Sequence, residues 1–579
     1  RSHHDVPLFG AMAGAALRIP PDSYSHQAVA ILLNGYSKTL SFGPKPRTPE
    51  EAWDHAPLFS YLSHVALQLE PFKWDSQGIA LVLNSLARMH LHDELLLSTF
   101  AGYAVSIPPE AFSPQNVANI VNACAKSHYK HVPLLDHMSR SARGVRCEEF
   151  EPQAIANVLN AYARLDHLDM PLVQHLCKAT LRCDTSLLTA QGVANTVNAL
   201  AKFDVRDPPL LKHISSTIIH DIIPTCSSQG TTPWGGVCIG FDPQAVANVA
   251  NAYARLEYRD TELFTALREV AIGLSSEVWD HQALALVLNA YAKVEIFDRS
   301  LFDYLGEVAR QVPERSYNAQ AVSNVANAFA KADLTDPPLF AFLSNVTLQL
   351  PRSEFTAQGV SIVLNAFAKL DVRDEALFSR LSSVAQSLPP SDFSSQSIAN
   401  IVNAFAKCDL DDPRLMRSMS RAAQCLSPSD FSGQAIGVMV NAWTRGSDYD
   451  YDLLDYLAEV IIQQPYALYE AQNVALIINA YVKADRVTSE LFSYMRCVAS
   501  TLDFSMGDAQ NVAVIMNSLA KVETFGSEEK GLGTLFETLV QAVPKMNQST
   551  ISAQAIGNVA NAIARRLPHN SGGRGDTER

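Results

Sequence analysis

The chain has 579 residues, of which 47% are apolar, and a formal net charge of −14. This balance excludes a uniformly basic nucleic-acid coat but allows a local basic stripe. The nine cysteines include no Cys-x-x-Cys pair, so we expect no disulfide framework and no metal site. No apolar run is long enough to cross a membrane.

The N-terminal residues 1–26 read as the second half of a repeat. The run Asp5-Val6-Pro7-Leu8-Phe9 matches Asp336-Pro337-Pro338-Leu339-Phe340 further along. A partial repeat consisting of its second helix is therefore predicted here. On this interpretation the chain begins inside a repeat array, and a targeting segment is expected to lie outside this sequence.

Residues 27–566 are predicted to form a helical-repeat array. A glutamine followed seven residues later by an asparagine recurs fourteen times, and ten of the thirteen steps are 38 residues long. The units start at Gln27, Gln77, Gln115, Gln153, Gln191, Gln244, Gln282, Gln320, Gln358, Gln396, Gln434, Gln472, Gln510 and Gln554. Longer steps predict surface insertions near 39–51, 224–240 and 524–533, and the polar residues 567–579 are predicted to be a disordered tail.

Each unit contains start signals for two helices. Two residues before the glutamine stands an N-cap residue such as Ser113, Asp280 or Ser394. The second helix opens with Asp-x-Pro-Leu, as at 336–339, where proline suits a first turn. Strand signals are absent. We therefore predict an all-α fold, a right-handed-type α-solenoid of about 14 helix pairs, called A and B below.

Helix A has distinct faces when positions are counted from the glutamine as zero. Positions 2, 5, 6 and 9 are large and apolar, as in Val246, Val249 and Tyr253, and are expected to pack on helix B. Positions 1, 3, 8 and 10 are small, as in Ala154 and Ala156. Small flanks let neighbouring A helices approach closely, which predicts that the A helices line the concave wall.

A third face carries positions 0, 4, 7 and 11 within one narrow stripe. Position 11 is cationic in every unit and predicts phosphate contacts: Lys38, Arg88, Lys126, Arg164, Lys202, Arg255, Lys293, Lys331, Lys369, Lys407, Arg445, Lys483, Lys521 and Arg565. The base-facing candidates at position 4 are Asn119, Asn157, Asn195, Asn248, Asn324, Asn400 and Asn558. Those at position 7 are Asn122, Asn160, Asn198, Asn251, Asn289, Asn327, Asn365 and Asn403.

This stripe suits a flexible polyanion, and single-stranded RNA is the favoured ligand. Cations at regular intervals can hold phosphates, and amide side chains can both donate to and accept from base edges. Structural alternatives remain open. The amides can form a ladder between helices, and the cations can stabilise helix C-termini. The acids that often follow at position 13, such as Asp166 and Asp204, can neutralise cations of a neighbouring repeat.

Catalytic signals are missing from the sequence. It contains no His-Glu-x-x-His, no Gly-x-Ser-x-Gly, no phosphate-binding lysine loop and no Gly-x-Gly-x-x-Gly before a helix. We therefore expect no enzymatic activity, no cofactor, no metal and no small-molecule substrate.

Two repeat units resemble a known class of proteins. Their sequences are Gln-Ala-Val-Ala-Asn-Val-Ala-Asn-Ala-Tyr-Ala-Arg at 244–255 and Gln-Ser-Ile-Ala-Asn-Ile-Val-Asn-Ala-Phe-Ala-Lys at 396–407. They resemble organellar helical-repeat RNA-binding proteins: octotricopeptide and heptatricopeptide repeats, RAP-associated repeats and FAST-kinase-like regions. No RAP domain and no Pro-Pro-Pro-Glu-Trp signature is visible. The resemblance implies a mitochondrial or plastid location, single-stranded RNA or ribosomal RNA as ligand, and partner proteins in a ribonucleoprotein such as a mitoribosome. A protein-interaction scaffold within a large organellar complex is the alternative function.

Overall fold

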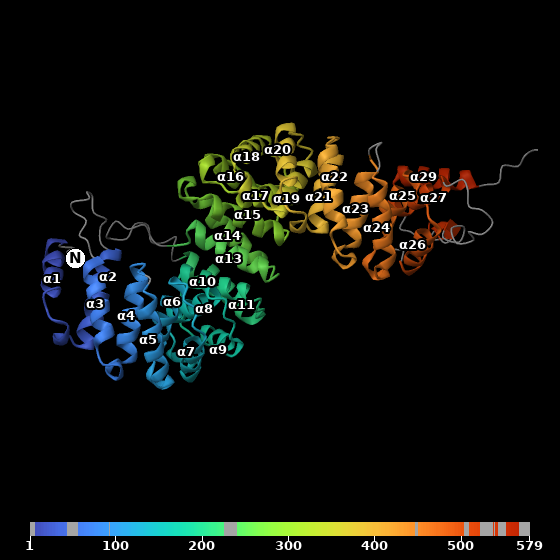
Figure 1. Cartoon of the computed structure of the whole chain (residues 1–579). Helices are drawn as coiled ribbons and strands as arrows, with labels where there is room; N and C mark the ends of the chain where they lie inside the picture. Colours follow the sequence, from blue (N-terminus) through green and yellow to red (C-terminus); the bar gives the residue numbers. More distant parts are fainter. Residues whose placement is uncertain are drawn as a thin grey trace, which may run out of the picture. The chain divides into compact units, whose positions relative to one another are not determined.

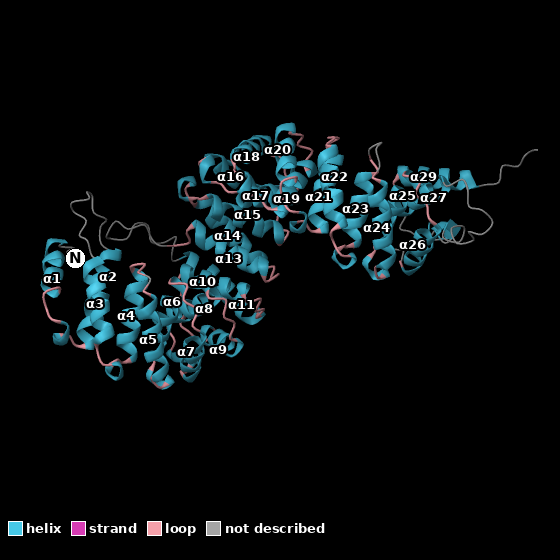
Figure 2. Cartoon of the chain, in the orientation of Figure 1, coloured by secondary structure: helices cyan, strands magenta, loops and turns pink. Residues whose placement is uncertain are grey.

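The computed structural model describes residues 6–42, 56–91, 93–224, 240–445, 450–502, 509–521 and 552–566, with short pieces at 536–537, 539–541 and 543. Helices are the regular elements throughout these ranges, which contain no strand (Figure 2). The predicted all-α solenoid is confirmed. The chain divides into two compact units, residues 1–305 and 306–579. The handedness of the superhelix stays a prediction.

The A helices form one layer of each unit, because each packs along the next A helix (Figure 1). In the first unit they are α2 (His26–Phe42), α4 (Ser76–Arg88), α6 (Pro114–Lys126), α8 (Pro152–Arg164), α10 (Ala190–Lys202), α13 (Pro243–Arg255) and α15 (His281–Lys293). In the second unit they are α17 (Ala319–Ala332), α19 (Ala357–Lys369), α21 (Ser395–Lys407), α23 (Gly433–Trp443), α25 (Ala471–Lys483), α27 (Ala509–Lys521) and α29 (Ala553–Arg566).

The B helices form the second layer, and most of them pack on the A helix of their own repeat. They are α1 (Val6–Ala16), α3 (Ala56–Gln68), α5 (Glu94–Ser106), α7 (Val132–Gly144), α9 (Met170–Thr180), α11 (Pro208–Thr217), α14 (Thr261–Gly273), α16 (Arg299–Gln311), α18 (Pro337–Gln349), α20 (Glu375–Ala385), α22 (Pro413–Gln424), α24 (Tyr451–Gln463) and α26 (Ser489–Thr501). A π-helical turn, Ile218–Ile222, continues α11. Residues 6–16 form α1, which precedes the first A helix, and the assignment of residues 1–26 to a partial repeat stays a prediction.

Three predicted segments fall mostly outside the described residues. In the first insertion, α2 runs on to Phe42, so residues 39–42 are helical, and residues 43–51 are not described. Residues 225–239 of the second insertion and 524–533 of the third are not described either. The predicted tail, 567–579, also lies outside the described part.

A short 3-10 turn, absent from the predicted repeat, precedes most A helices. These turns are η1 (Pro21–Ser23), η2 (Pro71–Lys73), η3 (Pro109–Ala111), η4 (Cys147–Glu149), η5 (Thr185–Leu187), η7 (Ser276–Val278), η8 (Glu314–Ser316), η9 (Arg352–Glu354), η10 (Pro390–Asp392), η11 (Pro428–Asp430) and η12 (Tyr466–Leu468). The residue after each turn is usually a buried aromatic, such as Phe112 or Phe393. Each turn thus brings its aromatic into the core just before the next A helix starts.

The predicted N-caps are present. The Ser113 hydroxyl accepts a hydrogen bond from the Asn116 N–H at 3.2 Å at the start of α6. The Asp336 carboxylate accepts one from the Leu339 N–H at 3.0 Å at the start of α18. Ser394 forms a reciprocal capping box at the start of α21. These bonds satisfy N–H groups that a helix start leaves without partners, so they fix where each helix begins.

The two predicted packing faces of helix A are also confirmed. The apolar face is buried, and Val246, Val249 and Tyr253 are all 0% exposed. The Tyr162 hydroxyl of α8 donates to the Leu135 carbonyl of α7 at 2.6 Å, which joins the two layers. The small flanking residues lie between neighbouring A helices. This packing turns the remaining polar stripe away from the B layer.

The A helices end in a recurrent left-handed residue at position 13. The φ angle is 54° at Asp333 and 60° at Asp371, and eight other repeats have a positive φ at this position. The next N–H donates back to the carbonyl of position 9, as Leu334 does to Phe329 at 3.1 Å. This is a Schellman C-cap, in which aspartate and histidine are tolerated better than most residues.

Gly433, at the start of α23, is expected to be intolerant of a larger side chain. A Cβ at this position would collide with the carbonyl oxygen of Leu468 in η12 of the next repeat. Gly433→Ala should therefore destabilise the protein by about 1–3 kcal/mol, through displacement of that turn. Gly102→Ala is the matched control, because a Cβ at Gly102 meets open space and alanine favours the helix. Urea midpoints should fall for the first variant and rise for the second; equal midpoints would contradict the packing.

Candidate nucleic-acid interface

The cations at position 11 recur in the last turn of the A helices or next to it. Because neighbouring A helices are packed side by side, these cations form one row in each unit, called the cation row below. The first unit contributes Lys38, Arg88, Lys126, Arg164, Lys202, Arg255 and Lys293, and the second contributes Lys331, Lys369, Lys407, Arg445, Lys483, Lys521 and Arg565. Twelve are exposed, and Arg88 and Lys126 are half-buried.

Carboxylates do not neutralise the cation row. Apart from Arg88, no member forms an ion pair with any acid in the described part of the chain. The acids at position 13, which could have neutralised a neighbouring repeat, form ion pairs elsewhere or none. Asp204 and Glu257 both pair with Arg206, at 3.3 and 2.8 Å. Arg88 apart, the row therefore presents positive charge that no carboxylate of the described residues neutralises.

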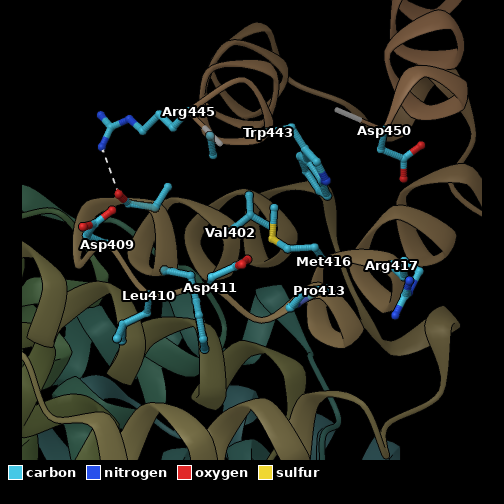
Figure 3. Close-up of a pocket in the computed structure, with 13 residues that line it drawn as sticks. Val402, Asp409, Leu410, Asp411, Pro413, Met416, Arg417, Trp443, Arg445 and Asp450 are labelled. Atoms are coloured by element: carbon cyan, nitrogen blue, oxygen red, sulfur yellow. Dashed lines mark hydrogen bonds between the residues drawn. The ribbon is translucent and has the colours of Figure 1, made fainter. Parts of the chain in front are cut away.

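Three row members contact the C-terminal end of the preceding A helix. The Lys407 ammonium donates to the Lys369 carbonyl at 3.3 Å, and the Lys483 ammonium donates to the Arg445 carbonyl at 3.5 Å. The Arg445 guanidinium donates to the Ala406 carbonyl at 3.4 Å, the dashed line in Figure 3. These long bonds fit the structural alternative in which cations stabilise helix C-termini. They leave the positive charges without a counter-ion.

Like charges crowd the row at Lys126. Burial lowers the pKa of this ammonium, and the neighbouring cations Arg88 and Arg164 lower it further. Both neighbours belong to the flanking repeats, so the three charges repel one another across the row. An arrangement of this kind costs the free protein stability and favours binding of an anion.

Lys126→Gln should raise the stability of the free protein and lower its affinity for a polyanion. The pKa of Lys126 is lower in the folded protein than in the unfolded chain, so folding disfavours the charged form. This cost to stability is fully present at pH values below the folded-state pKa, and it disappears as the pH rises to the unfolded-state pKa. The variant should melt above the wild type at pH 7, with the difference shrinking towards pH 10.5. A variant that melts lower at pH 7 would show that the helix-capping role dominates instead.

The amides of the stripe fall into two groups. Gln115, Gln153, Gln244 and Gln396 each donate to the position 4 asparagine of the same helix, at 3.1–3.4 Å. The position 7 asparagines are mostly half-buried. Among the fourteen, which are all described, Asn479 alone has a side-chain hydrogen bond, accepted from Ser518 at 3.1 Å. A continuous amide ladder between A helices is therefore absent from the described side chains, and most position 7 amides have hydrogen-bonding capacity to spare.

Other kinds of site find no support in the described residues. They contain no cluster of three or more histidine, cysteine or acidic side chains placed to hold a metal ion. Within the same ranges, helices of the length and hydrophobicity that a bilayer crossing requires do not occur. The exposed cation row with its half-buried amides is thus the strongest candidate site that the described chain offers, and its chemistry is that of an anion-binding surface.

The architecture defines the chain as an α-solenoid with a basic stripe on its A helices. Residues 235–480 match the sequence model of a family described as RNA-editing substrate-binding complex 6 protein. This part of the chain is therefore similar to a family of RNA-associated helical-repeat proteins. Membership of the octotricopeptide or RAP-associated families stays a prediction.

Two further comparisons add little. None of the curated proteins matches the chain. Among solved structures, a chain of a full-length AP-3 complex homology model in an intermediate open conformation has a TM-score of 0.27 and 12% identity, covering 97% of this chain and 87% of that chain. At that level, the likeness indicates nothing about function.

Proposed function

We propose that the protein binds single-stranded RNA along the cation row, as a non-catalytic subunit of a ribonucleoprotein complex. The observation that supports this most is the row of position 11 cations, twelve of which are exposed and form no ion pair with an acid in the described residues. Single strands are flexible enough to follow such a row, and their phosphates are regularly spaced. The position 4 and 7 amides lie on the same stripe and would face the bases.

The match at residues 235–480 supports the same proposal, because the matched family is named for a complex that binds the substrates of RNA editing. We propose that the bound strand is an organellar transcript, with a ribosomal RNA segment as a special case. The location that fits the sequence resemblance is the mitochondrion, with the plastid as the alternative. Stabilisation or processing of that RNA would be the biological outcome.

Direct binding tests this function. A labelled single strand of about 30 nucleotides should bind with an affinity that falls linearly as the logarithm of salt concentration rises. A duplex of the same length should compete weakly, because its phosphates follow a stiffer path. Fluorescence anisotropy measures both. No binding at about 50 mM salt would reject the function and favour a scaffold that holds proteins alone.

A further inference from the structure

Each A helix presents the polar side chains of its stripe in a fixed order. From the C-terminal end backwards, the stripe holds the cation of position 11, the asparagine of position 7 and the variable residue of position 4, as in Lys407, Asn403 and Asn400 of α21. Successive members are about 4.5–6 Å apart along the helix axis, because each residue advances an α-helix by about 1.5 Å. Since neighbouring A helices pack side by side, this line of three side chains repeats along each unit.

The three positions differ in how much they vary along the chain. All fourteen repeats have a cation at position 11 and an asparagine at position 7, whereas position 4 changes between asparagine and an aliphatic residue such as Ile362 or Leu476. A side chain that is the same in every repeat cannot read a changing sequence of bases. It suits a group that every nucleotide shares, and a nucleotide has two such groups, the phosphate and the sugar. The cations suit the phosphate, which leaves the sugar for the asparagines.

The position 7 amides have the hydrogen-bonding capacity that a contact with a sugar needs. Thirteen of the fourteen side chains form no hydrogen bond within the described residues, and Asn479 is the exception. Apart from Asn517 Oδ1, none of their oxygen or nitrogen atoms is buried without a partner in that part of the chain, so most of the amides are open to a ligand. Each amide offers two donors and an acceptor, and a hydroxyl group both donates and accepts.

We propose that the position 7 asparagines bind the ribose 2′-hydroxyl of a single strand and make the chain select RNA over DNA. This inference rests on the proposed function, and it assigns position 7 to the sugar instead of the base. The 2′-hydroxyl is the group by which a protein can tell RNA from DNA. The order cation, asparagine, variable residue along the helix then matches the order phosphate, sugar, base within a nucleotide.

Two strands that differ only in the 2′-hydroxyl test the selection directly. A uridine strand of about 20 nucleotides should bind the whole chain about tenfold or more tightly than the same strand of deoxyuridine. The two strands carry the same phosphates, so their affinities should fall with salt concentration at the same slope. Fluorescence anisotropy measures both. Equal affinities would overturn the inference and leave single-strand binding by the cation row in place.

Replacing Asn327, Asn365 and Asn403 together with alanine should remove much of this selection. Each lost hydrogen bond should cost about two- to fivefold in affinity, so the uridine strand should bind about ten- to hundredfold more weakly. Affinity for the deoxyuridine strand should stay unchanged, and so should the salt slope for either strand, because no charge is removed. An equal loss for both strands would overturn the inference, since the asparagines would then act on the base or on the fold.

The matched control removes three primary amides from the B helices of the same unit. Asn345→Ala, Gln424→Ala and Gln463→Ala change exposed residues of α18, α22 and α24 and should leave both affinities unchanged. Melting curves should confirm that both triple variants fold, as expected because alanine favours helices more than asparagine or glutamine. If neither strand binds the wild type at about 50 mM salt, the proposed function fails and the inference fails with it.

Discussion

Replacing Lys331, Lys369, Lys407 and Lys483 together with glutamine is expected to lower the affinity for single-stranded RNA several-hundred-fold. All four are exposed members of the cation row in the second unit, and none pairs with an acid in the described chain. Each phosphate contact on a single strand contributes about −0.7 to the slope of log K against log salt. Four lost contacts reduce the slope by about 2.8, which corresponds to about 2.8 log units of affinity at 0.1 M salt.

The control for this variant removes the same charge elsewhere in the same unit. Arg315 and Arg352 lie in the 3-10 turns η8 and η9, and Arg414 and Arg421 lie on the B helix α22; all four are exposed. Their joint replacement by glutamine should change the affinity by no more than a few-fold, because they lie outside the row. Anisotropy titrations at several salt concentrations compare the two variants. Equal losses would mean that net charge, rather than the row, governs binding.

The sequence predicted the repeat well because its signals are local and repeated. The N-caps Ser113 and Asp336, and the apolar face containing Val246, depend only on helix geometry, so one unit predicts the others. The 3-10 turns were not predicted, because three-residue helices leave little periodicity to detect. The signal that could have indicated them was the buried aromatic, such as Phe112, that directly follows most of these turns.

The candidate site was only partly predictable. The sequence placed Lys331 and its equivalents on one stripe, but whether an acid neutralises them depends on contacts between repeats. Asp333 adopts a left-handed conformation at the C-terminal end of its helix. This backbone role explains why an acid recurs at position 13 although it forms no ion pair with the cation row. An aspartate or histidine followed by an apolar residue at each helix end was the missed signal.

The same C-caps allow the charge beside the row to be changed without changing the fold. Three exposed C-cap aspartates have φ angles of 52–60°: Asp333, Asp371 and Asp409. Asparagine also tolerates this conformation, so replacing the three aspartates with asparagine should cost little stability. Each carboxylate lies two residues beyond a row cation and repels a bound phosphate chain through screened, high-dielectric surroundings. Removing three such charges should raise the affinity for single-stranded RNA about fivefold at low salt.

A matched triple variant, Glu354→Gln with Asp392→Asn and Glu459→Gln, removes the same charge from exposed positions away from the C-terminal ends of the A helices, where the cation row lies. It should leave affinity almost unchanged, because screening weakens charges beyond about 10 Å at 0.1 M salt. Thermal melting verifies that both triple variants fold. An equal gain in the two would trace the effect to net charge. No gain in the first variant would mean that the bound phosphates lie away from the C-terminal ends of the A helices. That result would rule out the cation row as the RNA path.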